Sequence, residues 1–139
     1  MRAVFADTGY WIAISNPRDS LHLHAKDVSR ALSPVCLVTS EMVLTEYLND
    51  FGQRGTFLRR AAAKLTERLR RDANTTVVRQ TSARFWAAVD FYAARADKAW
   101  SHTDCASFHI MERYRLTEAL TYDKHFEQAG FRALLRGPE

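Results

Sequence analysis

The short apolar run AVFA at residues 3–6 ends in an acid, Asp7, and a second run, EALT at 118–121, is followed closely by Asp123. Short runs of this kind, bounded by polar residues or breakers, are typical of buried strands. Three more runs have the same character: Val35–Thr39 after the breaker Ser33-Pro34, Thr75–Arg79, and Phe131–Leu135 after Gly130. The sequence therefore predicts four or five strands, two of which place a carboxylate near their carboxyl end.

Helical patterns separate these strands. They are expected at Leu21–Leu32 after the N-cap candidate Ser20, Glu41–Phe51 after Ser40, Thr56–Asp72 after Gly55, Thr81 to about Lys98, and Thr103–Leu116 after Ser101. Strands that alternate with helices pair in parallel through right-handed crossovers. The expected fold class is α/β, with a central parallel β-sheet of four or five strands flanked by helices in one domain, residues 1–139.

The composition narrows the class of protein. A chain of 139 residues that is 47% hydrophobic and 26% charged is typical of a globular domain with its own core. Its net charge of +4 and pI near 9.3 weakly favour a polyanionic partner. Cys36 and Cys105 lie outside any CxxC pattern and are expected to be reduced thiols. Because Asp7 interrupts the apolar N-terminus, no signal peptide is predicted, and the expected location is cytoplasmic.

Four acidic residues are the candidate site: Asp7, Glu46, Asp104 and Asp123. Ligands of open parallel sheets bind beyond the carboxyl ends of the strands, so these acids are expected to gather at one edge. Carboxylates held close together repel one another and resist ionisation, which a divalent cation relieves. Hard oxygen ligands suit Mg²⁺ or Mn²⁺, so the sequence predicts a magnesium or manganese site.

Each acid also has a structural interpretation. Asp7 and Asp123 are good N-cap residues for the segments that follow them, and Glu46 falls on the polar side of its helix. Asp104 completes a capping box with Ser101. Asp104 also shares a helix face with apolar residues, however, and a buried carboxylate needs a partner. These alternatives remain open at the level of sequence.

Neighbouring polar side chains are less decisive. Three threonines lie within two residues of the acids and could orient a carboxylate or hold a water: Thr8, Thr103 and Thr121. The histidines show no metal-ligand spacing, and His102 and His125, which flank the acids, are interpreted as surface residues.

Basic residues concentrate on one expected helix: Arg59, Arg60, Lys64, Arg68, Arg70 and Arg71. They form either a solvated helix face or an electrostatic rail for a phosphate backbone. Four aromatic residues have helical spacings that predict core or a subunit interface rather than a base-stacking platform: Trp11, Phe85, Trp86 and Phe91.

Taken in order, the acid-bearing motifs resemble those of PIN-domain ribonucleases, in particular the VapC-type toxins of bacterial toxin–antitoxin pairs. The motifs are FADTGYW at 5–11, TSEMVLTEYLN at 39–49, WSHTDCASFHIMER at 100–113 and EALTYDKHFEQAGF at 118–131. The resemblance covers nearly the whole chain. It implies that all four acids are catalytic and bind one or two Mg²⁺ or Mn²⁺ ions. It also implies an RNA substrate, single-stranded or structured, a homodimer, and a small antitoxin protein whose C-terminal segment blocks the cleft.

The implied reaction is hydrolysis of RNA by metal-activated water, which leaves 5′-phosphate and 3′-hydroxyl ends. Two other classes are compatible with acids on such a sheet. One is a non-catalytic module that binds RNA or a basic peptide. The other is an aspartate-based phosphatase, but the DxDxT pattern of that chemistry lacks its second acid here, since Gly9 stands in its place.

Overall fold

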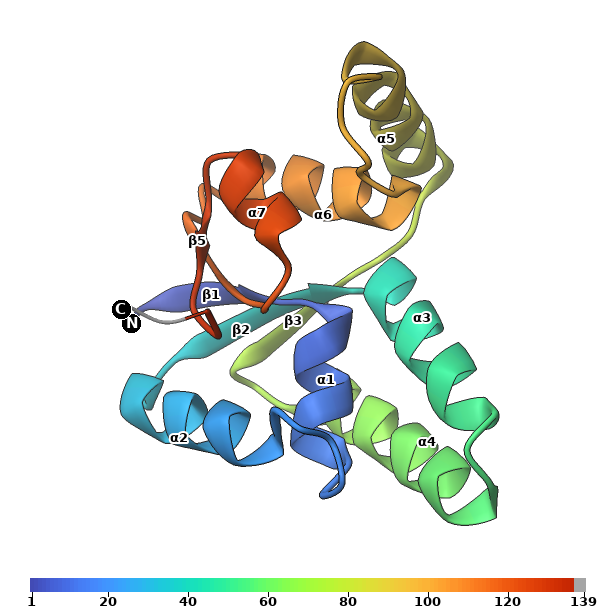
Figure 1. Ribbon diagram of the computed structural model, residues 1–139, viewed down its shortest axis with the longest axis vertical. Helices are drawn as coiled ribbons and strands as arrows, with labels where there is room; N and C mark the ends of the chain where they lie inside the picture. Colours follow the sequence, from blue (N-terminus) through green and yellow to red (C-terminus); the bar gives the residue numbers. More distant parts are fainter. Residues whose placement is uncertain (137–139) are drawn as a thin grey trace.

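A five-stranded parallel sheet forms the centre of the protein, in a computed structural model that describes residues 1–136 (Figure 1). The strand order is β3-β2-β1-β4-β5. The strands are β1 (Ala3–Ala6), β2 (Cys36–Ser40), β3 (Thr75–Val78), β4 (Glu118–Leu120) and β5 (Arg132–Ala133). All four pairings are parallel, which confirms the α/β class expected from the alternation of strands and helices.

Helices cover both faces of this sheet. They are α1 (Thr8–Ser15), α2 (His22–Leu32), α3 (Glu41–Gly52), α4 (Thr56–Arg71), α5 (Ser82–Ala94), α6 (His102–Arg113) and α7 (Lys124–Gln128). In Figure 1, α1 to α4 lie below the sheet and α6 and α7 lie above it, while α5 stands against α6 at the top of the molecule. No helix within residues 1–136 is long and apolar enough to cross a lipid bilayer.

Several helix boundaries differ from the sequence expectation. The residue before α2 is Leu21, not the expected cap Ser20, and Asp19 Oδ1 accepts a hydrogen bond from the Leu21 N–H at 2.9 Å. The helix expected to reach Lys98 ends at Ala94, and an Arg95–Asp97 ion pair follows in the turn. The helix expected to reach Leu116 ends at Arg113, since Arg115 has a left-handed φ of 56°.

Helix α1 has no counterpart among the expected helices. Its sequence, TGYWIAIS, is apolar almost throughout, so the helical period leaves no polar face that a pattern could detect. The strand predictions are correct to within a few residues, and β5 is the shortest, covering only Arg132–Ala133 of the expected Phe131–Leu135.

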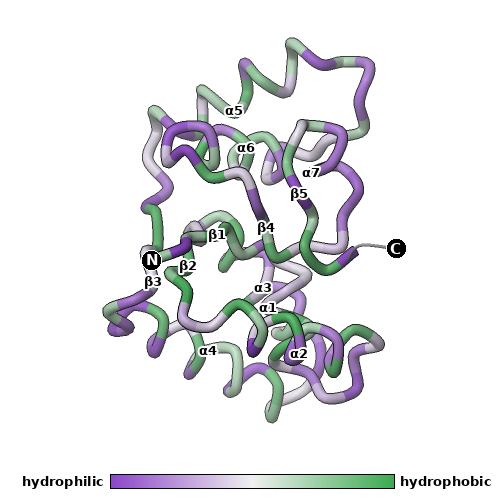
Figure 2. Tube along the Cα trace, turned by 90° about the vertical axis from the view of Figure 1, so that its left-hand side faces the viewer, coloured by the Kyte–Doolittle hydropathy of each residue, from purple (hydrophilic) through white to green (hydrophobic). Residues whose placement is uncertain are grey.

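The core is built on β1, whose Val4, Phe5 and Ala6 are fully buried, and Figure 2 shows apolar colour through the central strands. Trp11 of α1 is also buried, and its indole N–H donates to Thr39 Oγ1 at 3.1 Å. Both cysteines are free thiols, as the sequence predicts: Cys36, and Cys105, which is buried in α6. The packing fixes α1, α6 and α7 around the carboxyl ends of β1 and β4.

Candidate metal centre

Asp7 lies at the carboxyl end of β1, where α1 begins, and is only 9% exposed. It occupies the N-cap position of α1, yet its side chain makes no capping hydrogen bond. Instead its Oδ2 accepts a hydrogen bond from Thr121 Oγ1 at 2.9 Å. Burial, together with the smaller effect of the Asp104 and Asp123 charges, raises the pKa of Asp7 to about 7, and hydrogen bonds from Thr8 and Thr121 oppose this rise. Within residues 1–136, the Asp7 carboxyl group forms no ion pair that would offset its burial.

The Thr121 hydroxyl connects two of the acids. It donates to Asp7 and accepts a hydrogen bond from the Asp123 backbone N–H at 3.0 Å. Asp123 in turn caps α7, accepting from the His125 backbone N–H at 2.9 Å. The capping interpretation of Asp123 is therefore correct. A second Asp123 oxygen stays outside that bond, so capping and a role in the site are compatible.

Asp104 lies in the first turn of α6. The capping box is present: Ser101 Oγ accepts from the Asp104 N–H at 3.0 Å, and Asp104 Oδ2 accepts from the Ser101 N–H at 3.1 Å. Asp104 is 9% exposed, which confirms the expected burial, and that burial raises its pKa although bonds from Ser101 and His125 oppose the rise. The box holds this carboxylate in a fixed orientation at the start of the helix.

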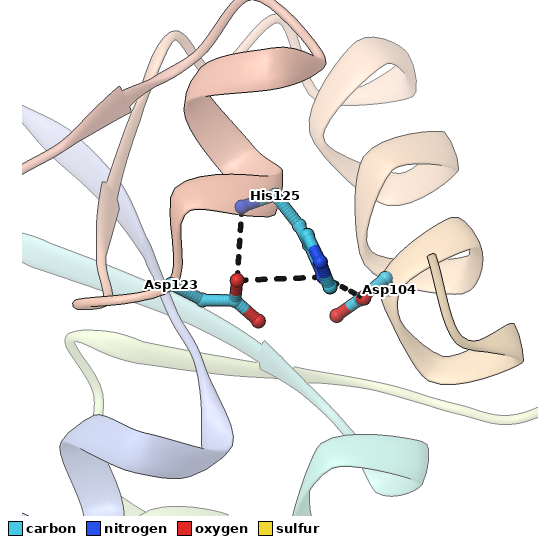
Figure 3. Close-up of side chains that lie close together, drawn as sticks. All are labelled: Asp104, Asp123 and His125. Carbon is cyan, nitrogen blue, oxygen red and sulfur yellow. Dashed lines mark hydrogen bonds and ion pairs between the residues drawn. The ribbon is translucent and has the colours of Figure 1, made fainter. Parts of the chain in front are cut away.

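His125 of α7 joins these acids, contrary to its interpretation as a surface residue. Its Nδ1 lies 3.0 Å from Asp104 Oδ2 and 3.4 Å from Asp123 Oδ1. Potential ligand atoms of Asp104, Asp123 and His125 all lie within 4.8 Å of one another (Figure 3). The only signal in the sequence is its place two residues after a capping Asp, which puts its ring beside that carboxylate.

Glu46 stands at the margin of the site. It is an exposed residue of α3, as its place on the polar side of the helix predicts, and its Oε1 accepts a hydrogen bond from Thr8 Oγ1 at 2.8 Å. Thr8 follows Asp7 directly, so this bond ties α3 to the carboxyl end of β1. The structure thus gathers Asp104, Asp123 and His125, connects Asp7 through Thr121, and holds Glu46 through Thr8.

The donor set fits a divalent cation. Carboxylate oxygens suit Mg²⁺ and Mn²⁺, and an imidazole nitrogen is accepted by manganese and later transition metals. Asp7 supports the fit, because within residues 1–136 its buried carboxyl group contacts no cationic side chain. A bound cation would lower the pKa of Asp7 and so favour its ionised form.

The basic residues of α4 fall into two groups in the structure. On α4, Arg70 and Arg71 pair with Glu67 at 2.7 and 3.6 Å. Arg60, Lys64 and Arg68 line a hollow of about 630 Å³ together with Phe57, which is largely exposed. The rail for a phosphate backbone stays a prediction.

Comparison with known proteins agrees with this geometry. No family model matches the sequence. The chain is 28% identical over 131 residues to the 23S rRNA-specific endonuclease VapC20 of Mycobacterium tuberculosis, covering 92% of this chain and 95% of that protein. The crystal structure of M. tuberculosis VapC20, described as a Sarcin-Ricin loop cleaving toxin, matches with a TM-score of 0.82 at 26% identity over 92% of this chain and 95% of that one. FitAcB from Neisseria gonorrhoeae matches with a TM-score of 0.60 at 17% identity over 97% and 99% of the two chains, a likeness of fold alone.

The five-stranded parallel α/β fold of this chain matches the PIN-domain fold of the VapC20 crystal structure. In both sequence and structure the chain is similar to VapC20.

Proposed function

We propose that the protein is a metal-dependent endoribonuclease that hydrolyses phosphodiester bonds in RNA. Its catalytic and metal-binding residues are Asp7, Glu46, Asp104 and Asp123. The observation that carries the proposal is the convergence of Asp104, Asp123 and His125 within 4.8 Å, beside a buried Asp7 whose pKa is about 7. We further propose that residues 1–139 act as a single PIN-like domain.

When bound, Mg²⁺ or Mn²⁺ supplies stabilisation of the charge on the phosphate and a more acidic water. The side chains of the protein position the ion and the reacting groups. Asp104 and Asp123 would hold the ion, the first fixed by its capping box and the second by α7. Thr121 orients Asp7 toward the same edge, and Thr8 holds Glu46 where it can accept a proton from the attacking water. Attack by water yields 5′-phosphate and 3′-hydroxyl ends.

The relative VapC20 points to a substrate class. Since that protein is named for cleavage of 23S rRNA, we propose structured ribosomal RNA as the first substrate to test for this chain. The net charge of +4 favours such a polyanion. A cognate antitoxin protein that covers the cleft, a homodimer and a cytoplasmic location are further proposals that follow from the same relationship.

The test is to map RNA ends after incubation of the purified protein with 23S rRNA in Mg²⁺, in Mn²⁺ or in EDTA. We expect discrete new 5′-phosphate ends only with metal, and their loss in Asp104→Asn, which keeps the shape and the capping bonds but removes the charge. Asp27→Asn is the matched control, because Asp27 is an exposed acid on α2 whose ion pair with Arg30 contributes little.

Two results would contradict the proposal. Products ending in 2′,3′-cyclic phosphate would mean attack by the ribose hydroxyl instead of water. An Asp104→Asn protein as active as Asp27→Asn would remove Asp104 from the site. Metal-independent RNA binding with no cleavage would instead favour the non-catalytic binding module.

A further inference from the structure

Three aromatic side chains form a cluster where α5 meets the start of α6, here named the α5 aromatic cluster: Phe85, Trp86 and His102. The rings of Phe85 and Trp86 meet edge to face with centroids 5.2 Å apart, and those of Phe85 and His102 lie 4.5 Å apart. Trp86 is 61% exposed and Phe85 40% exposed. Of the two alternatives that the sequence left open, core is therefore wrong for these two residues, while a subunit interface is untested; in the single chain a large aromatic surface faces solvent.

This cluster is attached to the helix that carries the candidate catalytic carboxylate. His102 is the first residue of α6, and its Nε2 lies 3.0 Å from the Phe85 carbonyl oxygen. Asp104 follows two residues later, about 3 Å further along the helix axis. Side chains two residues apart point about 200° apart around a helix, so the cluster lies near the start of α6 but on a different face from Asp104.

A basic hollow of about 590 Å³ lies between the same two helices. It is lined by Arg84 of α5 and by His109 and Arg113 of α6, with Tyr114 just beyond. His109 and Arg113 follow His102 by seven and eleven residues, spacings that share one helix face. The hollow therefore lies on the same face of α6 as His102, with Arg113 about 16 Å further along the helix axis, although the three cluster residues themselves do not line it. In Figure 1, α5 stands on α6 and leaves this junction at the edge of the molecule.

The charge of this hollow is uncompensated. Arg84 Nη1 donates to the Arg79 carbonyl oxygen at 2.9 Å, and neither Arg84 nor Arg113 forms an ion pair within residues 1–136. Exposed rings and guanidinium groups on the same pair of helices are a combination that binds single-stranded nucleic acid, because bases stack on the rings and cations neutralise the phosphates.

We propose that the α5 aromatic cluster and the basic hollow bind the single-stranded part of an RNA substrate. An unpaired base stacks on Trp86, and phosphates lie at Arg84 and Arg113. The inference rests on the proposed nuclease function, because it names a part of the substrate that the protein recognises away from its carboxylates.

The first test measures binding without cleavage. The probe is a short, fluorescently labelled, single-stranded oligoribonucleotide of mixed sequence, titrated in EDTA. Trp86→Ala is expected to weaken binding by roughly 5- to 100-fold, the effect of losing one stacking partner. Trp86→Phe keeps a ring and should bind nearly as wild type. Tyr92→Ala is the matched control, since Tyr92 is another exposed aromatic of α5 with no contact to the cluster in residues 1–136.

Two further titrations separate stacking from general charge. In a series of oligonucleotides that each carry one abasic position, the wild type should lose affinity at particular positions, and Trp86→Ala should be insensitive to them. Arg113→Gln should weaken binding and reduce the slope of log affinity against log salt by about 0.7. Arg18→Gln, an exposed residue between α1 and α2, should leave both unchanged.

Equal RNA affinity of Trp86→Ala and wild type would overturn the inference, as would failure of the wild type to bind the probe. A dimer contact would also overturn the inference. In that case sedimentation would show that Trp86→Ala dissociates a dimer, and the dissociated protein would keep its RNA affinity, because the cluster joins two copies of the chain. A parallel cleavage assay distinguishes the two proposals. RNA binding that depends on Trp86, without cleavage in any metal, would contradict only the proposed nuclease function. Cleavage on which Trp86→Ala has no effect would contradict only the proposed RNA binding by the α5 aromatic cluster and the basic hollow.

Discussion

Replacing Asp7 by Asn should make the metal-free protein more stable than the wild type above pH 7. The folded-state pKa of Asp7 is about 7, well above its ordinary value of 3.8. Between those pH values the folded protein keeps a proton that the unfolded chain has already released. The contribution of protonated Asp7 to the free energy of unfolding is therefore fully present below pH 4 and is lost as the pH rises toward 7.

The size of the effect follows from that interval. At about 1.4 kcal/mol per pH unit, the difference between 3.8 and about 7 corresponds to an upper value of about 4 kcal/mol. Asn has no charge to desolvate, and its side-chain oxygen can still accept the hydrogen bond of Thr121. The stability of Asp7→Asn should thus not fall in this way, and at pH 8 its free energy of unfolding should exceed that of the wild type by up to about 4 kcal/mol.

The assay is urea unfolding in EDTA at a series of pH values from 4 to 8, with Asp27→Asn as the control for loss of an exposed acid. The difference between Asp7→Asn and wild type should grow with pH, while Asp27→Asn should follow the wild type. Adding Mn²⁺ should then stabilise the wild type, by about 2.7 kcal/mol at one hundred times the dissociation constant, and should stabilise Asp7→Asn less.

Parallel pH curves for wild type and Asp7→Asn in EDTA would refute the reasoning, because they would mean that burial does not oppose ionisation of Asp7. Equal stabilisation of both proteins by Mn²⁺ would leave the burial argument intact and would remove Asp7 from the metal site.

Three other predictions concern the side chains that position the acids. Thr121→Val removes the hydroxyl between Asp7 and Asp123; the free energy of unfolding should fall by about 1–3 kcal/mol in urea, the cost of a buried group left unpaired. Thr8→Val frees Glu46, which is exposed; single-turnover cleavage should slow while thermal stability changes little, and unchanged cleavage would mean that the hydrogen bond of Thr8 does not position Glu46 for the reaction. His125→Gln removes the imidazole between two acids; Mn²⁺ affinity by calorimetry should fall by roughly 10- to 100-fold, and an unchanged affinity would mean that the ring takes no part.

The exposed aromatic residues show what helical spacing in a sequence does not decide. Trp11 and Trp86 both have helical spacing among apolar neighbours, yet Trp11 is 3% exposed and Trp86 is 61% exposed. Helical period assigns a residue to a face of its helix, but it does not say whether another element covers that face. Helix α5 packs chiefly against α6, and within residues 1–136 Trp86 stays largely exposed.

The sequence by itself determined the parallel sheet, the acids at the carboxyl ends of β1 and β4, and the capping box of Ser101 and Asp104. These features depend on neighbours within one strand or one helical turn, whose patterns are written directly in the chain. Only the tertiary structure decided that Thr121 donates a hydrogen bond to Asp7, 114 residues away, and that the His125 ring contacts Asp104, 21 residues away. Contacts at such separations depend on how packed elements place particular atoms, and no local pattern carries that information.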